Sequence, residues 1–228
     1  MKYSAIIFDL DGTIIDTEPL WEKSNLEVLA NMGIQVTDEV KEKLKDKVTG
    51  LGVREACNIM KKTLKLQAPV KKLVEQQVSA ASKIYNQEIK FMEGFEEFHK
   101  KVTLMNLKKG IATNANLKIL HLAKNKLKLE QFFGNHMYCV DHVNHISKPD
   151  PAIYLHAARK LQVKPKRCIA IEDSSCGITA AKNAGMFVIG INSAKNHKLL
   201  GQADVIVENY KDIELEHILE EKTKAIGL

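Results

Sequence analysis

Short apolar runs recur along the chain, and nearly every one of them stops at a polar residue. The runs are rich in Ile and Val, are apolar at successive positions and are too short to form helices. Such runs are typical of strands buried on both faces, as in a parallel sheet covered by helices. The pattern therefore predicts an α/β fold with six strands, at residues 3–8, 110–112, 137–140, 168–171, 187–191 and 205–207.

Helices are expected between these strands. One of them, over residues 177–184, can be capped by Asp173 or Ser174, and Gly185 is placed to end it in the left-handed conformation. In a parallel sheet the carboxyl ends of the strands face one crevice, where ligands bind. The polar residues that follow the strands are therefore expected to meet there.

The connection between the first two strands is unusually long. About a hundred residues separate Asp9 from Thr113, whereas a crossover between parallel strands needs about a dozen. Much of this stretch has apolar residues at helical spacing and few β-branched runs. We therefore expect a small all-helical domain, residues 16–91, inserted into a core formed by residues 1–15 and 92–228.

The sharpest local signal follows the first strand. Asp9 and Asp11 lie two positions apart, and Gly12 allows the chain to turn so that both carboxylates point into the crevice. Neighbouring carboxylates repel, which raises one pKa unless a cation or a proton intervenes. The pair therefore implies a divalent metal or a shared proton, although an ordinary acidic turn is the alternative for this motif alone.

Three further strand ends carry polar groups. Thr113 and Asn114 offer a hydroxyl and an amide before a helix, an arrangement that suits an oxyanion but is also common in helix caps. Lys148 lies in a loop stiffened by two prolines. Glu172 and Asp173 form a second acid pair, whose hard oxygens suit Mg²⁺, although Asp173 could merely cap the next helix.

This ordered set of motifs resembles the haloacid dehalogenase-like superfamily of phosphohydrolases. Residues 9–13 (DLDGT) are similar to its first motif, Thr113 to the second, Lys148 to the third, and residues 172–173 to the fourth. The helical insertion resembles the cap of the β-phosphoglucomutase-like branch, which includes pseudouridine-5′-phosphatase. The resemblance covers essentially the whole chain and implies a doubly wound, Rossmann-like core with a cap that shapes substrate specificity.

The resemblance also implies roles. Asp9 would attack phosphorus and form an aspartyl-phosphate, while Asp11 would protonate the leaving oxygen and then activate water. Mg²⁺ would be held by the Asp9 carboxylate, the Asp11 backbone carbonyl and Asp173.

For the phosphate itself, the resemblance points to Thr113, Asn114 and Lys148, together with nearby backbone N–H groups. Glu172 is implied either as a further metal ligand or as an anchor for Lys148. These residues define the expected catalytic, substrate-binding and metal-binding set of the core.

The carboxylate of Asp11 favours cleavage of a phosphate ester, because the departing alkoxide needs a proton. A sugar phosphomutase is the alternative with the same core. Mutases of this branch carry a histidine early in the first cap helix, and residues 17–21 contain none. We therefore expect a Mg²⁺-dependent phosphatase for a sugar, nucleoside or polyol phosphate. A non-catalytic protein that binds a phosphorylated ligand is disfavoured by the complete motif set.

In the inserted domain, residues 49–54 resemble the glycine-rich substrate loop of this branch. The resemblance suggests that Gly50 and Arg54 contact the substrate, and a surface position for Arg54 is an equal alternative. Lys83 is a weaker candidate for the same pocket. Trp21 is expected to pack the cap, with stacking on a substrate left open.

Composition narrows the partners and the location. Four scattered cysteines without metal or disulfide spacing favour a reducing cytoplasm, and no apolar run approaches the ~18 residues of a membrane span. The net charge of +6 suits a small phosphorylated metabolite, while spread lysines and 6% aromatic residues disfavour nucleic acid. His136, His142 and His145 are expected to be incidental surface histidines. A monomer is the default expectation.

Overall fold

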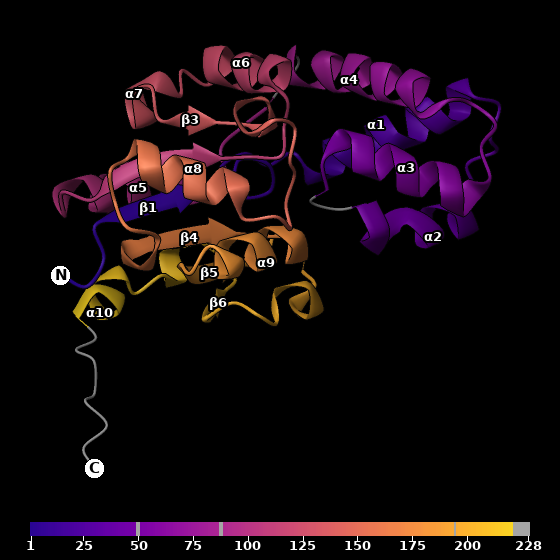
Figure 1. Cartoon of the computed structure of the whole chain (residues 1–228). Helices are drawn as coiled ribbons and strands as arrows, with labels where there is room; N and C mark the ends of the chain where they lie inside the picture. The colour runs from indigo at the N-terminus through magenta and orange to yellow at the C-terminus, as the bar shows by residue number, and fades with distance from the viewer. Residues whose placement is uncertain (49–50, 87–88, 194, 221–228) are drawn as a thin grey trace.

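The apolar runs form one sheet of six parallel strands in the computed structural model, which describes residues 1–48, 51–86, 89–193 and 195–220. The strand order is β3-β2-β1-β4-β5-β6 (Figure 1). The predicted doubly wound parallel sheet is confirmed. The strands are β1 (Ala5–Phe8), β2 (Lys108–Ala112), β3 (Met137–Tyr138), β4 (Cys168–Glu172), β5 (Phe187–Ile191) and β6 (Val205–Val207).

Both faces of the sheet are covered, which explains why most strand positions are apolar; Lys108 and Lys109 at the start of β2 are exceptions. In β1, Ile6 and Phe8 pack into the core on one face, whereas Ala5 and Ile7 pack into the core on the other. Helices α5 (Phe95–Leu104), α6 (Leu117–Lys126), α7 (Glu130–Phe133) and α10 (Leu215–Glu220) cover the first face, and α8 (Ala152–Lys160) and α9 (Ser175–Asn183) cover the second.

Local signals set several element ends. The side chain of Ser174 accepts a hydrogen bond from the Gly177 backbone N–H at 3.2 Å and caps α9, and Gly185 follows that helix with a φ of +80°. The predicted strand at 137–140 is too long by two residues. The Cys139 N–H donates to the His142 side chain instead of a neighbouring strand, and a 3₁₀ turn, η1 (Val140–Val143), begins. Further 3₁₀ turns are η2 (Pro165–Arg167), η3 (His197–Leu200) and η4 (Tyr210–Asp212).

Besides α5, four helices lie in the long connection between β1 and β2, within the part of the chain that the structure describes. These are α1 (Glu18–Asn31), α2 (Asp38–Val48), α3 (Val53–Leu64) and α4 (Val70–Asn86). They enclose a separate apolar cluster that includes Leu29, Met60 and Leu73, and α4 also packs against α6 (Figure 1). We call these four helices the cap helices. The residue boundaries of the two predicted domains stay a proposal.

Two neighbouring chain crossings join the cap helices to the sheet. The Asp16 N–H donates to the Lys90 carbonyl at 3.1 Å, and the Met92 N–H donates to the Ile14 carbonyl at 2.9 Å. The entering and leaving segments are therefore hydrogen-bonded to each other directly beside the end of β1. The two segments thereby place the cap helices next to the carboxyl edge of the sheet (Figure 1).

Candidate active site

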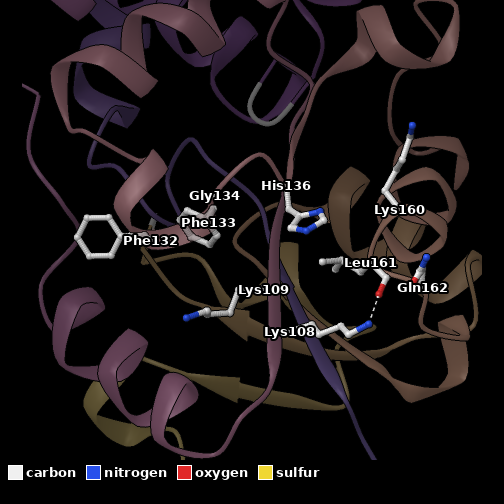
Figure 2. Close-up of a pocket in the computed structure, with 9 residues that line it drawn as sticks. All are labelled: Lys108, Lys109, Phe132, Phe133, Gly134, His136, Lys160, Leu161 and Gln162. Atoms are coloured by element: carbon white, nitrogen blue, oxygen red, sulfur yellow. Dashed lines mark hydrogen bonds between the residues drawn. The ribbon is translucent and has the colours of Figure 1, made fainter.

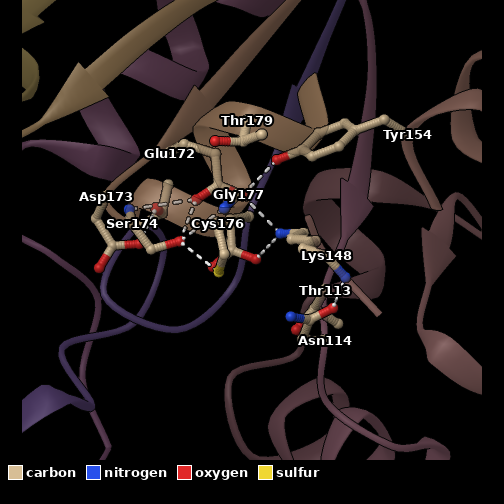
Figure 3. A network of polar contacts seen from close by, with 12 residues as sticks. Thr113, Asn114, Lys148, Tyr154, Glu172, Asp173, Ser174, Cys176, Gly177 and Thr179 are labelled. Atoms are coloured by element: carbon tan, nitrogen blue, oxygen red, sulfur yellow. Dashed lines mark hydrogen bonds and ion pairs between the residues drawn. The ribbon is translucent and has the colours of Figure 1, made fainter. Parts of the chain in front are cut away.

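The predicted polar residues meet at the carboxyl edge of the sheet. Asp9 follows β1, Thr113 follows β2, and Glu172 ends β4, which are three adjacent strands. The loop before α8 brings Lys148 to the same place, where it is 1% exposed (Figure 3). The structure therefore brings these groups together, as expected for residues that follow parallel strands, because such strands end at a common edge.

Lys148 links two carboxylates. Its Nζ donates to Asp9 Oδ1 and, at 2.6 Å, to Glu172 Oε1. Burial opposes its charged form, but the two carboxylates outweigh burial and raise the pKa of Lys148 above its ordinary value. The Lys148 backbone N–H also donates to Asn114 Oδ1 at 2.8 Å. The ammonium group is therefore held in place between two carboxylates that favour its charged form.

Glu172 is saturated with hydrogen bonds. Its Oε1 accepts from Lys148 and from the Tyr154 hydroxyl, each at 2.6 Å, while Oε2 accepts from the Ser174 hydroxyl at 3.1 Å (Figure 3). A Cβ at Gly177 would overlap this carboxylate, so the first turn of α9 requires a glycine there. With both oxygens occupied, Glu172 is better suited to anchoring Lys148 than to binding a metal directly.

Asp9 and Asp173 fit a divalent cation. One carboxylate oxygen each from Asp9, Glu172 and Asp173 lie within 4.8 Å of one another, and all three residues are buried. Burial raises the pKa of Asp9 to about 8, against the opposing attraction of Lys148. A nearby cation favours the ionised form of such a group. Hard oxygens on a crowded acidic cluster are the donor set that suits Mg²⁺.

The turn after β1 is built around Asp173. Gly12 has a φ of +78°, and a Cβ at this position would overlap the Asp173 carboxylate. The Thr13 hydroxyl donates to Asp173 Oδ1 at 3.2 Å, and the Ser193 hydroxyl donates to Oδ2 at 3.4 Å. Gly12 of the first motif is therefore required because Asp173, which is distant in the sequence, approaches it closely.

Thr113 and Asn114 lie on the opposite side of Lys148 from Asp173 (Figure 3). The Thr113 hydroxyl accepts a hydrogen bond from the Ala115 backbone N–H at 3.0 Å and keeps its own proton to donate to a ligand. Asn114 holds the backbone of Lys148 with its amide oxygen. The cap of α6 is Asn116, whose Oδ1 accepts from the Ile119 N–H at 3.0 Å, so Thr113 is not needed as a helix cap.

Asp11 is held by the cap helices and by the segment that leads to them. Its Oδ1 accepts from the Thr17 hydroxyl at 2.7 Å, from Trp21 Nε1 at 3.0 Å and from the Tyr85 hydroxyl. Burial, together with the neighbouring Asp11, raises the pKa of Tyr85 well above its ordinary value, so its hydroxyl stays a neutral donor. Trp21 was expected to pack the cap, with stacking on a substrate left open, and no motif pointed to Tyr85.

A cavity of about 470 Å³ extends from these groups into the cap helices. Asp9, Asp11 and Thr113 line its floor, and Trp21 and Gln77 belong to its cap side. This volume is in the range of small-molecule sites. The cavity therefore connects the reactive carboxylates with side chains that can contact the rest of a ligand.

Two of the cap residues suggested as substrate contacts, Arg54 and Lys83, lie outside the described lining of this cavity, which for Arg54 agrees with the surface alternative. Arg54 is exposed and is not among the described residues that line the cavity, where Lys41 is a lining cation. Lys83 forms an ion pair with Glu27 at 3.3 Å on the outer surface. Gly50 lies outside the described residues.

A second cavity, of about 510 Å³, lies at the opposite end of β2 (Figure 2). Two of the three described lysines that line it have protein partners: Lys108 Nζ donates to the Leu161 carbonyl and Lys109 Nζ to the Thr103 hydroxyl, each at 2.7 Å. His136 also lines it and pairs with the Tyr138 hydroxyl at 2.9 Å. This cavity holds none of the predicted site residues.

The other two histidines of that region also have local protein partners. His142 Nδ1 bonds the backbone of Cys139, and His145 lies 3.8 Å from Asp141. Within the described part of the chain, the acidic cluster at Asp9 is the group found with metal-ligand geometry. Also within that part, no helix has both the length and the apolar character needed to cross a bilayer.

Comparison with protein families places this site in a class. The model of the haloacid dehalogenase-like hydrolase family matches residues 6–191, a span that includes every one of the strand-end motifs. The chain belongs to this family of hydrolases, which confirms the resemblance inferred from the motifs.

Individual relatives agree with that class. A phosphorylated carbohydrates phosphatase of Thermotoga maritima is 29% identical over 182 residues, covering 80% of this chain and 82% of that protein. Hexitol phosphatase B of Escherichia coli K12 is 28% identical over 218 residues, covering 94% and 96%. The crystal structure of β-phosphoglucomutase from Clostridium difficile has a TM-score of 0.80 at 25% identity, covering 96% of both chains. The expected phosphatase class of enzyme is thereby supported.

Proposed function

We propose that this hydrolase is a Mg²⁺-dependent phosphatase that cleaves a phosphorylated sugar or polyol through an aspartyl-phosphate on Asp9. The observation that carries the proposal is the buried arrangement of Asp9 beside Lys148 and Asp173, at one end of a ligand-sized cavity. The family match and the two phosphatases among the relatives support the reaction class.

The first half-reaction transfers the phosphoryl group to Asp9. A carboxylate oxygen of Asp9 forms a bond to phosphorus as the bond from phosphorus to the ester oxygen breaks, and Asp11 gives its proton to that departing oxygen. Lys148 and the Thr113 hydroxyl donate hydrogen bonds to the phosphoryl oxygens, which carry the charge of the transition state.

The second half-reaction restores the enzyme. Asp11, now ionised, takes a proton from a water molecule whose oxygen bonds to phosphorus, and the bond between phosphorus and Asp9 breaks. Inorganic phosphate and the Asp9 carboxylate are the products. One residue therefore serves as acid and then as base, which requires its carboxyl group to keep the same position throughout.

Asp9, Asp173 and the backbone carbonyl of Asp11 are the groups proposed to hold Mg²⁺. When bound, the ion would neutralise the repulsion between the Asp9 carboxylate and the incoming phosphate. Glu172 is proposed as the anchor of Lys148, because both of its oxygens already accept hydrogen bonds within the protein. Removal of divalent cations with a chelator is expected to abolish turnover, and added Mg²⁺ to restore it.

The cavity supports a polyhydroxylated substrate. Asn25 and Gln77 line its cap side, and the Gln77 Nε2 donates to Asn25 Oδ1 at 2.6 Å. Gln77 Oε1 is buried and has no partner among the described residues. An unpaired buried acceptor is costly, and a substrate hydroxyl would satisfy it. The two relatives named as carbohydrate and hexitol phosphatases favour the same substrate class.

A sugar phosphomutase is the second candidate, favoured by the fold-wide similarity to β-phosphoglucomutase. The absence of histidine in residues 17–21 opposes it. The two are separated by incubating the protein with β-glucose 1-phosphate and Mg²⁺. A phosphatase releases inorganic phosphate, whereas a mutase forms glucose 6-phosphate without equivalent release.

The defining experiment is phosphate release from a panel of hexitol, sugar, nucleoside and glycerol phosphates, with and without Mg²⁺. We expect release that requires Mg²⁺, is lost in Asp9→Asn, and persists in Asp204→Asn, whose carboxylate pairs with Lys182 away from the site. Ligand binding without release by the wild-type protein would favour a non-catalytic binding protein. The absence of a nucleic-acid partner and the cytoplasmic location stay predictions from composition, and the monomeric state stays a default expectation.

A further inference from the structure

The carboxyl group of Asp11 is surrounded by donors that the proposed reaction does not itself require. Three side chains donate to a single oxygen, Oδ1: the hydroxyls of Thr17 and Tyr85, and the indole N–H of Trp21. Thr17 is close in the chain, but Trp21 and Tyr85 come from α1 and α4. Two separate cap helices therefore reach the same atom.

The two aromatic donors also hold each other. The rings of Trp21 and Tyr85 meet edge to face, with centroids 6.3 Å apart and planes at 65°. Tyr85 is fully buried, and Trp21 is half-buried between the apolar core and the cavity. Each ring thus has little freedom to rotate, and the donors are preorganised for the carboxylate.

We propose that Trp21 and Tyr85 are positioning residues that fix the carboxyl group of Asp11 for proton transfer to the leaving oxygen. With three donors on Oδ1, the transferable proton is directed to Oδ2, which moves it to the ester oxygen as the phosphorus–oxygen bond breaks. The inference rests on the proposed phosphatase function. It assigns to the cap helices a part in the chemical step, in addition to contact with the substrate.

Simple packing would also explain buried aromatic rings, since Trp and Tyr usually find a partner for their polar atoms. The two explanations differ in which substrates a variant affects. An alkyl ester has a poor leaving group and needs the proton, whereas p-nitrophenyl phosphate has a good leaving group and does not. Loss of positioning therefore slows one substrate and spares the other.

The test compares kcat/KM for a hexitol phosphate and for p-nitrophenyl phosphate in Trp21→Phe and Tyr85→Phe. This ratio of constants reports the steps up to departure of the leaving group, before Asp11 acts on water. Tyr138→Phe is the matched control, because it removes a buried phenol hydroxyl that pairs with His136. The emission of Trp21, the single tryptophan of the chain, checks that α1 keeps its packing in Tyr85→Phe.

We expect kcat/KM of each variant to fall about tenfold or more for the hexitol phosphate and by less than about threefold for p-nitrophenyl phosphate. The control should keep the wild-type ratio. Three results would each overturn the inference and leave the proposed function intact. These are equal losses of kcat/KM on both substrates, a change confined to KM, and an unchanged kcat/KM on the hexitol phosphate. A wild-type protein that released phosphate from neither ester would overturn the proposed function and the inference with it.

Discussion

The sheet edge and the cap helices contribute to one cavity by different means. At the sheet edge, strand ends fix the backbone and a buried ion pair between Lys148 and two carboxylates fixes the side chains. On the cap side, the lining residues come from the faces of four helices, and their positions depend on how those helices pack. The difference indicates that the chemistry is encoded locally along the chain, whereas substrate contacts and the orientation of Asp11 are encoded by tertiary packing.

The largest expected effect concerns the ion pairs at the sheet edge. In Lys148→Met, the carboxylates of Asp9 and Glu172 remain buried without their common cation, which is expected to cost about 3–5 kcal/mol of unfolding free energy. Urea unfolding measures this loss, and phosphate release should also disappear. Lys182→Met is the matched control, because its pair with Asp204 is partly exposed and should contribute about 0–1 kcal/mol. Similar losses in both variants would contradict the account.

A smaller effect is expected for the donor at the end of β2. Thr113→Val keeps the shape of the side chain and removes the hydroxyl, so kcat should fall by about 10²–10³ with little change in stability. Steady-state kinetics with the best phosphate of the panel measures this. The control is Thr179→Val, whose exposed hydroxyl donates to the Ser175 carbonyl in α9. A wild-type kcat in Thr113→Val would remove this hydroxyl from the reaction.

The cap side is expected to respond in KM. In Gln77→Met the buried amide is lost at nearly constant volume, and KM for a polyol phosphate should rise roughly tenfold, in line with one lost hydrogen bond. The KM for p-nitrophenyl phosphate should stay within about twofold, because this ester has no hydroxyl to pair with Gln77 Oε1. Equal changes in KM for both esters would contradict the assignment of Gln77 to substrate hydroxyls.

The smallest effect is expected at Arg54. Its side chain is exposed outside the lining of the cavity among the described residues. We expect KM to change by less than about twofold in Arg54→Ala across the panel of phosphates, as for other exposed surface substitutions. A tenfold rise in KM, confined to substrates with a second anionic group, would instead show that Arg54 contacts the substrate, as the resemblance of its loop suggests.

The same contrast explains what sequence analysis could predict. Asp9, Thr113 and Glu172 were found because each directly follows a short apolar run, and parallel strands bring such ends together. Trp21 and Tyr85 lie 10 and 74 positions from Asp11, and their convergence depends on the packing of α1 against α4. No periodic pattern in the sequence predicts that Trp21 and Tyr85 both contact Asp11. The saturation of Glu172 likewise depends on Tyr154 and Lys148, which belong to other segments.

The central claim is that Asp9 receives the phosphoryl group and that Asp11 is then needed to release it. Rapid mixing of p-nitrophenyl phosphate and Mg²⁺ with Asp11→Asn tests both parts at once. We predict a burst of p-nitrophenol near one equivalent of enzyme followed by little turnover, and no burst in Asp9→Asn. Steady turnover without a burst in Asp11→Asn, together with wild-type activity in Asp9→Asn, would contradict the claim.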